Sequence, residues 1–151
     1  MHAQDEAGQN ESSEMTSLKV MSFNIRLGVA KDGPNEWAKR KDLVVSTIRN
    51  FEADVVGTQE TFDFQANYLS DQMPEFTYAG RSRQADGKGE HCGILFRNSR
   101  FQKLIEGHFW LSETPDQPGS KGWDSSYPRM ATWLKLWDQD CLLYTSDAAD
   151  E

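Results

Sequence analysis

Two short strand-like runs with a helical segment between them constrain this chain most. The first run spans residues 18–26 (LKVMSFNIR) and the second spans residues 54–60 (DVVGTQE). Apolar residues between them fall on one stripe of a helix: Trp37, Val44, Ile48 and Phe51. Asn35 precedes this stripe and is the expected N-cap. The order strand, helix, strand predicts a right-handed βαβ crossover whose two strands run parallel.

Each of the two runs ends in a polar side chain suited to phosphate chemistry. Asn24 lies near the end of the first run, and Glu60 closes the second. Mg²⁺ takes oxygen ligands, usually one or two carboxylates completed by water and substrate phosphate, and ligand sites gather at the carboxyl ends of strands. The pair therefore predicts a Mg²⁺ (or Mn²⁺) site, with Glu60 as ligand and Asn24 beside the metal and a phosphoryl oxygen. The alternatives are a solvated glutamate and an amide that bonds local backbone.

The remaining chain adds a second helix and then turns to β-structure. The helix is expected over residues 62–73, where Pro74 ends it. Apolar alternation and turn residues predict four further strands, over residues 76–79, 91–97, 102–112 and 129–137. We therefore expect one α/β domain over residues 17–138, with a mixed β-sheet and helices on one face.

Composition excludes several classes of protein. The chain has 151 residues and a formal net charge of −8, which is unsuited to a non-specific nucleic-acid clamp because such a clamp needs a basic stripe. The two cysteines, Cys92 and Cys141, are far apart and form neither a disulfide framework nor a zinc motif. No apolar run reaches the length of a membrane span.

Both ends of the chain differ in composition and sequence pattern from the predicted domain. Residues 1–16 are polar and acidic and are expected to form a disordered leader. Residues 2–5 are also compatible with the stub of a removed signal peptide, so export and a cytoplasmic location both stay open. Residues 139–151 resemble translated sequencing adapter and are interpreted as a non-native tail; the alternative is a genuine disordered terminus.

Four segments in order resemble the endonuclease/exonuclease/phosphatase superfamily, and in particular its bacterial metal-dependent hydrolase branch. They are VMSFNIR, DVVGTQE, GEHCGILFRNSRF and FWLSETPDQPGSKGWDSSYPRMATW, which together cover roughly residues 18–138. The resemblance implies that this chain is the first half of a four-layer α-β-β-α sandwich. It also implies Mg²⁺- or Mn²⁺-dependent hydrolysis of phosphodiesters or phosphomonoesters.

The resemblance assigns roles to four residues. Glu60 would bind the metal, and Asn24 would lie near the metal and the scissile phosphate. Glu90 stands where nuclease members have a glutamate that hydrogen-bonds the catalytic histidine, and Arg129 stands where an arginine contacts substrate phosphate. The substrate would be a nucleic acid, a nucleotide, a sugar phosphate or a lipid headgroup, and no obligate protein partner is implied.

The sequence departs from the family pattern in its acid/base residues. The Asn-x-His, Gly-Asp-x-Asn and Ser-Asp-His motifs of the family are absent, and the only histidines are His2, His91 and His108. We therefore expect the chain as given to be inactive, and to expose an apolar sheet face that favours self-association. His91 and His108 are expected to be structural, although His91 is also a candidate acid/base or metal-binding group.

Three further features have two interpretations each. Arg81, Arg83 and Lys88 could form a basic rim or belong to a solvated loop. Trp123 could stack on a base or sugar ring, or pack its loop against the domain. The competing function is a carbohydrate- or protein-binding module without enzymatic activity, built on the aromatic side chains Trp110, Trp123, Trp133 and Trp137.

Overall fold

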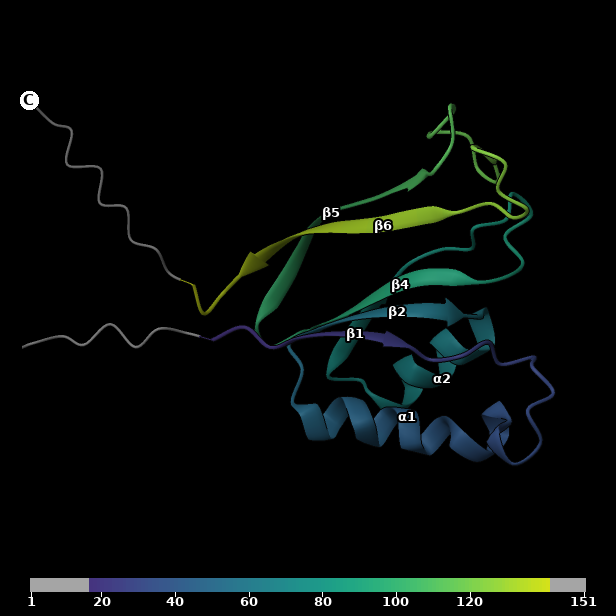
Figure 1. Ribbon diagram of the computed structural model, residues 1–151. Helices are drawn as coiled ribbons and strands as arrows, with labels where there is room; N and C mark the ends of the chain where they lie inside the picture. The colour runs from purple at the N-terminus through teal and green to yellow at the C-terminus, as the bar shows by residue number, and fades with distance from the viewer. Residues whose placement is uncertain (1–16, 142–151) are drawn as a thin grey trace, which may run out of the picture.

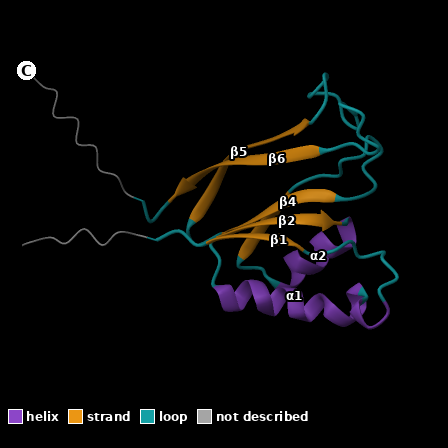
Figure 2. Cartoon of the chain, in the orientation of Figure 1, coloured by secondary structure: helices purple, strands orange, loops and turns teal. Residues whose placement is uncertain are grey.

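The computed structural model describes residues 17–141, which form an α/β arrangement (Figures 1 and 2). In chain order the elements are β1 (Val20–Asn24), the 3-10 turn η1 (Gly33–Asn35), α1 (Trp37–Phe51), β2 (Val55–Thr61), α2 (Asp63–Gln72), β3 (Phe76–Ala79), β4 (His91–Arg97), β5 (Phe101–Trp110) and β6 (Met130–Asp138). The expected leader, residues 1–16, and residues 142–151 of the expected tail lie outside the described residues.

The first four strands form a mixed sheet in the order β1-β2-β4-β3. Strands β1 and β2 are parallel, as the strand-helix-strand pattern predicts, and the other pairings are antiparallel. Helices α1 and α2 both lie on the same face of this sheet (Figure 2). The predicted mixed sheet with helices on one face is therefore confirmed. The β1–β2 register pairs Asn24 with Gln59 and so brings the two polar strand ends together.

The main hydrophobic core fills the space between the sheet and the helices. Its fully buried side chains come from both helices and from β2 and β4: Ile48, Leu69, Val56 and Leu95 are each 0% exposed. The helical stripe of α1 ends one turn earlier than expected, because Phe51 is 45% exposed. The expected N-cap was wrong: Asn35 is the last residue of η1, and Glu36 occupies the N-cap position of α1.

Strands β5 and β6 form a separate two-stranded antiparallel sheet on the side of the main sheet away from the helices (Figure 1). The buried guanidinium of Arg100 connects this sheet to the segment that precedes β2. It donates to both carboxylate oxygens of Asp138, at 3.0 and 2.9 Å, and to Asp54 at 3.0 Å. The backbone N–H of Gln139 donates to the Arg100 carbonyl at 2.8 Å, so the first residue of the expected tail is hydrogen-bonded to the residue that precedes β5.

No helix formed by residues 17–141 combines the length and the apolar character needed to cross a bilayer.

Candidate functional site

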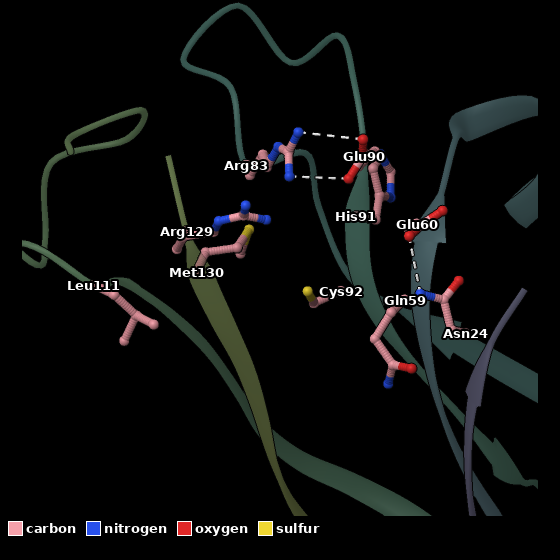
Figure 3. A pocket seen from close by; sticks show the side chains of 10 residues that line it. All are labelled: Asn24, Gln59, Glu60, Arg83, Glu90, His91, Cys92, Leu111, Arg129 and Met130. Atoms are coloured by element: carbon pink, nitrogen blue, oxygen red, sulfur yellow. Dashed lines mark hydrogen bonds and ion pairs between the residues drawn. The ribbon is translucent and has the colours of Figure 1, made fainter. Parts of the chain in front are cut away.

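A pocket of about 300 Å³ opens between the ends of β1, β2 and β5 and the starts of β4 and β6 (Figure 3). All four residues that the sequence singles out line it, namely Asn24, Glu60, Glu90 and Arg129. Its other lining residues are Gln59, Arg83, His91, Cys92, Leu111 and Met130. The fold thus brings together side chains that are more than 100 residues apart in sequence, from Asn24 to Arg129.

The backbone turns Glu60 out of the regular strand. The register between β2 and β4 shifts between Thr58 and Thr61, which marks an irregularity of the β-bulge type, and Glu60 has a φ of 57°. Such bulges redirect a side chain and are frequent next to active sites. A non-glycine residue in the left-handed region costs on the order of 1–3 kcal/mol and persists only where its surroundings hold it. Glu60 is held by the contacts its carboxylate makes.

Both oxygens of the Glu60 carboxylate accept hydrogen bonds. The Asn24 amide nitrogen donates to Oε1 at 3.0 Å, and the Leu27 backbone N–H donates to Oε2 at 3.0 Å. The Arg26 guanidinium lies 3.9 Å from Oε2. These contacts, the Asn24 hydrogen bond above all, lower the pKa of Glu60 below its ordinary value. Glu60 is therefore an ionised carboxylate with a fixed orientation.

Asn24 is itself oriented from the other side. Its Oδ1 accepts the backbone N–H of Arg26 at 2.9 Å, so the amide oxygen faces the turn after β1 and the amide nitrogen faces Glu60. The Asn24 side chain therefore bonds both the local backbone, which was the alternative interpretation of this residue, and the Glu60 carboxylate. An amide NH₂ has two hydrogens and its oxygen has two lone pairs, so Asn24 retains one donor and one acceptor for a ligand.

Sequence reasoning missed Gln65, a fully buried residue of α2 that holds the same turn. Its side-chain oxygen accepts the N–H groups of Gly28 at 2.9 Å and Phe62 at 3.0 Å, and its nitrogen donates to the Arg26 carbonyl at 3.0 Å. Leu27, which donates to Glu60, lies between two of these anchor points. Gln65 thus positions a donor of the candidate site.

A second anchor and a close contact keep this turn in place. The Arg40 guanidinium of α1 donates to the Arg26 carbonyl at 2.8 Å and also to the Ile25 carbonyl. A Cβ on Gly28 would lie 2.4 Å from the ring of Phe64, so the turn approaches α2 more closely than a side chain allows. Helices α1 and α2 therefore both fix the position of the turn that follows β1.

Glu90 faces an arginine in the pocket. The Arg83 guanidinium forms a bidentate ion pair with it, with distances of 2.9 Å from Nη1 to Oε2 and 3.2 Å from Nη2 to Oε1 (Figure 3). The two side chains are only 15% and 22% exposed. Among residues 17–141, no hydrogen bond or ion pair joins Glu90 to a histidine side chain, and its assignment as the partner of a catalytic histidine stays a prediction.

The solvated-loop interpretation of Arg83 was wrong, because tertiary contacts pin its loop. The buried Trp110 ring donates from Nε1 to the Arg83 carbonyl at 2.7 Å. The Arg83 guanidinium also lies 5.6 Å from the centre of the Tyr127 ring, and its buried Nε has no hydrogen-bond partner among the described residues. Arg81 and Lys88 of the same loop are exposed, which agrees with the solvated-loop interpretation for these two residues.

Arg129 presents the second guanidinium of the pocket. It directly precedes β6, its side chain points into the pocket beside Met130, and none of the ion pairs found among residues 17–141 involves it (Figure 3). The Leu111 N–H donates to the Arg129 carbonyl at 2.8 Å and so fixes its backbone. A planar guanidinium is a suitable donor for two oxygens of one anion.

His91 is buried in the wall of the pocket. Its Nε2 lies 2.9 Å from Asp63 Oδ1, and its Nδ1 lies 3.5 Å from the hydroxyl of Tyr78. Burial is the largest influence on His91 and lowers its pKa, while Asp63 acts in the opposite direction. Burial also raises the pKa of Tyr78 to about 12. The imidazole is therefore predominantly neutral at pH 7. The 2.9 Å approach to Asp63 lacks hydrogen-bond geometry, because the buried Nε2 has no hydrogen-bond partner among residues 17–141, and the structural role of His91 stays a prediction.

His108 lies outside the pocket. Its Nδ1 is 3.1 Å from the hydroxyl of Thr132 and its Nε2 is 3.3 Å from Glu106, which agrees with the structural role expected for it.

The tryptophans do not form one shared platform. Trp110 is 2% exposed, which removes it from any stacking surface, whereas Trp133 and Trp137 are 44% and 53% exposed. Trp123 is 73% exposed, so it does not pack its loop against the domain.

The residues present fit one hard divalent cation. Within residues 17–141 no three His, Cys, Asp or Glu side chains cluster so as to hold a metal. Mg²⁺ needs no such cluster, because it keeps several waters and is commonly bound by one or two carboxylates and by substrate phosphate. Glu60 offers an ionised, oriented carboxylate; the Asn24 group beside it is the amide nitrogen, which orients that carboxylate, while the amide oxygen faces the turn after β1.

Residues 21–147 match the sequence model of the Endonuclease/Exonuclease/phosphatase family. Similar solved structures include an endonuclease/exonuclease/phosphatase family protein from Bacteroides thetaiotaomicron, at 37% identity and a TM-score of 0.78 over 83% of this chain and 45% of that one. A mannosyl-6-phosphatase from the same organism is 36% identical, with a TM-score of 0.78 over 83% of this chain and 48% of that one.

A curated protein is also similar in sequence. The 3'-5'-exoribonuclease subunit Ccr4 of the CCR4-Not complex of Aspergillus clavatus is 26% identical over 153 residues, covering 87% of this chain and 22% of that protein. The chain thus spans about half the length of the two solved relatives and 22% of Ccr4.

Proposed function

The chain belongs to the endonuclease/exonuclease/phosphatase family, and from this we propose that it supplies the metal- and phosphate-binding part of a divalent-metal-dependent phosphoesterase. The family includes relatives named as a phosphatase and as an exoribonuclease, which supports hydrolysis of a phosphate ester at the level of the family. The dependence on Mg²⁺ or Mn²⁺ and the roles of individual residues are the finer part of the proposal.

The observation that carries the proposal is the convergence in one pocket of Asn24, Glu60, Glu90 and Arg129. Glu60 would hold the cation, and Asn24 would keep the Glu60 carboxylate in place through the hydrogen bond described above. Arg129 would donate N–H groups to oxygens of the bound phosphate. Glu90 would fix the Arg83 guanidinium at the pocket through the bidentate ion pair.

The bound cation would supply positive charge that stabilises the charge developing on the phosphoryl oxygens. The chain's own residues bind and orient the phosphate. They offer no exposed histidine as an acid/base group in the pocket, because His91 is buried and its pKa is lowered. We therefore expect the 151-residue chain to bind metal and phosphate without appreciable hydrolysis. The substrate proposed at this level is any phosphorylated nucleic acid, nucleotide, sugar or lipid headgroup.

Calorimetric titration of the chain with inorganic phosphate tests the proposal. Phosphate should bind in the presence of Mg²⁺, and its affinity should fall at least tenfold when EDTA removes the metal. Arg129→Lys should weaken Mg²⁺-dependent phosphate binding roughly tenfold, because an ammonium group cannot replace a bidentate fork. Lys88→Gln, on an exposed loop outside the pocket, is the matched control and should bind as the wild type does. Equal phosphate affinity with and without Mg²⁺ would contradict the proposal.

A further inference from the structure

A second hollow, of about 320 Å³, lies in the connection between β5 and β6. We call it the Trp123 groove and define it by its lining residues, which are Glu113, Lys121, Gly122, Trp123, Asp124 and Ser125. Trp123 has the largest exposed fraction, 73%, of any large hydrophobic side chain in the described part of the chain. An indole left in water forgoes the stabilisation that burial of a large apolar side chain contributes.

The backbone that presents this indole is strained. Trp123 has a φ of 52° and Asp124 a φ of 59°, so two consecutive non-glycine residues occupy the left-handed region. Each such residue carries backbone strain, and residues of this kind concentrate at ligand clamps and active sites. The strain does not serve packing, because Trp123 and Asp124 are both exposed.

Hydrogen bonds hold the surrounding loop in one conformation. The Ser112 and Ser120 hydroxyl oxygens are 2.7 Å apart, and the Ser120 hydroxyl donates to the Thr114 carbonyl at 3.0 Å. A Cβ on Gly122 would lie 2.6 Å from the Ser112 Cα, so the loop segment that carries Trp123 packs directly against Ser112, two residues after the end of β5. The indole is therefore presented by a fixed scaffold, which lowers the entropic cost of binding a ligand.

The Trp123 groove adjoins the pocket that holds the four predicted site residues. Leu111 lines that pocket and Glu113 lines the groove. These two residues are two positions apart, which limits the separation of their Cα atoms to about 7 Å. Since the Leu111 N–H donates to the Arg129 carbonyl, the groove begins near the backbone of the residue whose guanidinium is proposed to hold phosphate. The group esterified to that phosphate would lie toward the groove.

We propose that the Trp123 groove binds the sugar ring of the substrate, which makes a sugar phosphate the substrate class of the adjoining site. This rests on the proposed function. The flat indole offers a surface for the apolar C–H face of a pyranose, and the carboxylates of Glu113 and Asp124 accept hydrogen bonds from hydroxyl groups. A nucleic acid fits less well, because two carboxylates against the one Lys121 repel a polyanionic backbone.

The test uses the 151-residue chain labelled with 5-fluorotryptophan, whose five tryptophans give separate ¹⁹F signals. Trp123→Ala identifies the Trp123 signal by its loss. In the presence of Mg²⁺, mannose 6-phosphate should shift this signal, whereas inorganic phosphate should leave it in place. Trp123→Ala should weaken mannose 6-phosphate binding about tenfold without changing phosphate affinity, and Trp123→Phe should fall between the two. Trp137→Ala, which removes an exposed tryptophan of β6 outside both cavities, is the control.

Two outcomes would overturn the sugar subsite while leaving phosphate binding intact. One is unchanged mannose 6-phosphate affinity in a folded Trp123→Ala variant. The other is a larger shift of the Trp123 signal with a short oligothymidylate than with mannose 6-phosphate. Failure of inorganic phosphate to bind the wild-type chain with Mg²⁺ would instead refute the proposed function, and the phosphate titration distinguishes the two failures.

Discussion

Asn24 and Glu60 are joined by a 3.0 Å hydrogen bond from the amide nitrogen of the asparagine to Oε1 of the glutamate. The bond connects the ends of two parallel strands that are separated by a whole helix in sequence. Strand pairing alone aligns Asn24 with Gln59, and the left-handed backbone of Glu60 then returns its carboxylate to the asparagine. The two side chains therefore act as one unit, and perturbing either should change the other.

Replacing Asn24 with alanine should raise the pKa of Glu60, because the Asn24 hydrogen bond is the largest influence that lowers it. Since the folded-state pKa lies below the unfolded value of about 4.3, the bond stabilises the fold fully above that pH. Its contribution is lost as the pH falls through the folded-state pKa. Asn24→Ala should thus cost about 1–2 kcal/mol in unfolding free energy at pH 7 and progressively less in acid.

Urea unfolding at several pH values, together with ¹³C NMR titration of the Glu60 carboxyl without metal, measures both effects. Asn67→Ala, at an exposed position of α2, is the matched control and should leave the titration of Glu60 unchanged. A Glu60 pKa that is the same in Asn24→Ala and in the wild type would refute the role assigned to the amide.

Gln65→Leu should destabilise the fold and loosen the site together. The substitution leaves the partly buried Gly28 and Phe62 N–H groups without their partner, while the Arg26 carbonyl loses one bond and keeps the bond from Arg40. A loss of about 2–4 kcal/mol in unfolding free energy is expected. The pKa of Glu60 should also rise, because Leu27 loses its fixed position. Gln72→Leu, at the exposed end of α2, should change stability by less than about 0.5 kcal/mol. A destabilised Gln65→Leu variant with an unaltered Glu60 pKa would assign Gln65 to stability alone.

A double-mutant cycle should detect coupling between Arg83 and Glu90. Each partner is mostly buried, so removing one leaves the other charge poorly compensated. Glu90→Gln and Arg83→Met should each destabilise the chain by about 1–3 kcal/mol, and the double variant by less than their sum. Unfolding free energies of the four proteins give the coupling. Strict additivity would show that the bidentate geometry contributes nothing to stability.

Glu52→Gly should stabilise the chain against unfolding. Glu60 has a similar left-handed backbone, but its carboxylate makes hydrogen bonds that a glycine would lose. Glu52 is the C-cap of α1 with a φ of 56°, and glycine adopts this left-handed conformation without strain. The side chain contributes only an exposed ion pair with Lys19, which is worth little. We expect a gain of about 0.5–1 kcal/mol in thermal or urea unfolding. A loss of stability would show that the ion pair outweighs the backbone strain.

The sequence predicts those parts of the molecule that follow from periodicity and strand order. The alternation in β3 and β4 predicts both strands with their observed bounds, and the crossover order places Asn24 and Glu60 at one edge. This works because hydrophobic alternation and parallel pairing are set locally.

The missed features depend on contacts between distant segments. Arg83 lies in a loop without periodicity, and contacts from distant segments fix it, namely the Trp110 hydrogen bond from β5 and the Tyr127 ring. Gln65 resembles an ordinary polar position on a helix surface. Its place three residues after the helix N-cap, where a glutamine can bond back to the N-cap backbone, is the signal that could have identified it. The strained conformation of Glu60 has no sequence signal at all, because the left-handed region usually selects glycine.

Mn²⁺ binding measured by electron paramagnetic resonance tests the central claim most directly, since free Mn²⁺ gives a signal that bound Mn²⁺ loses. The wild-type chain should bind Mn²⁺, and Glu60→Gln, which keeps the shape of the side chain and removes its charge, should bind at least tenfold more weakly. Asp71→Asn, at an exposed position of α2 outside the pocket, should bind as the wild type does. Undiminished Mn²⁺ binding by Glu60→Gln would contradict the assignment of Glu60 as the metal ligand.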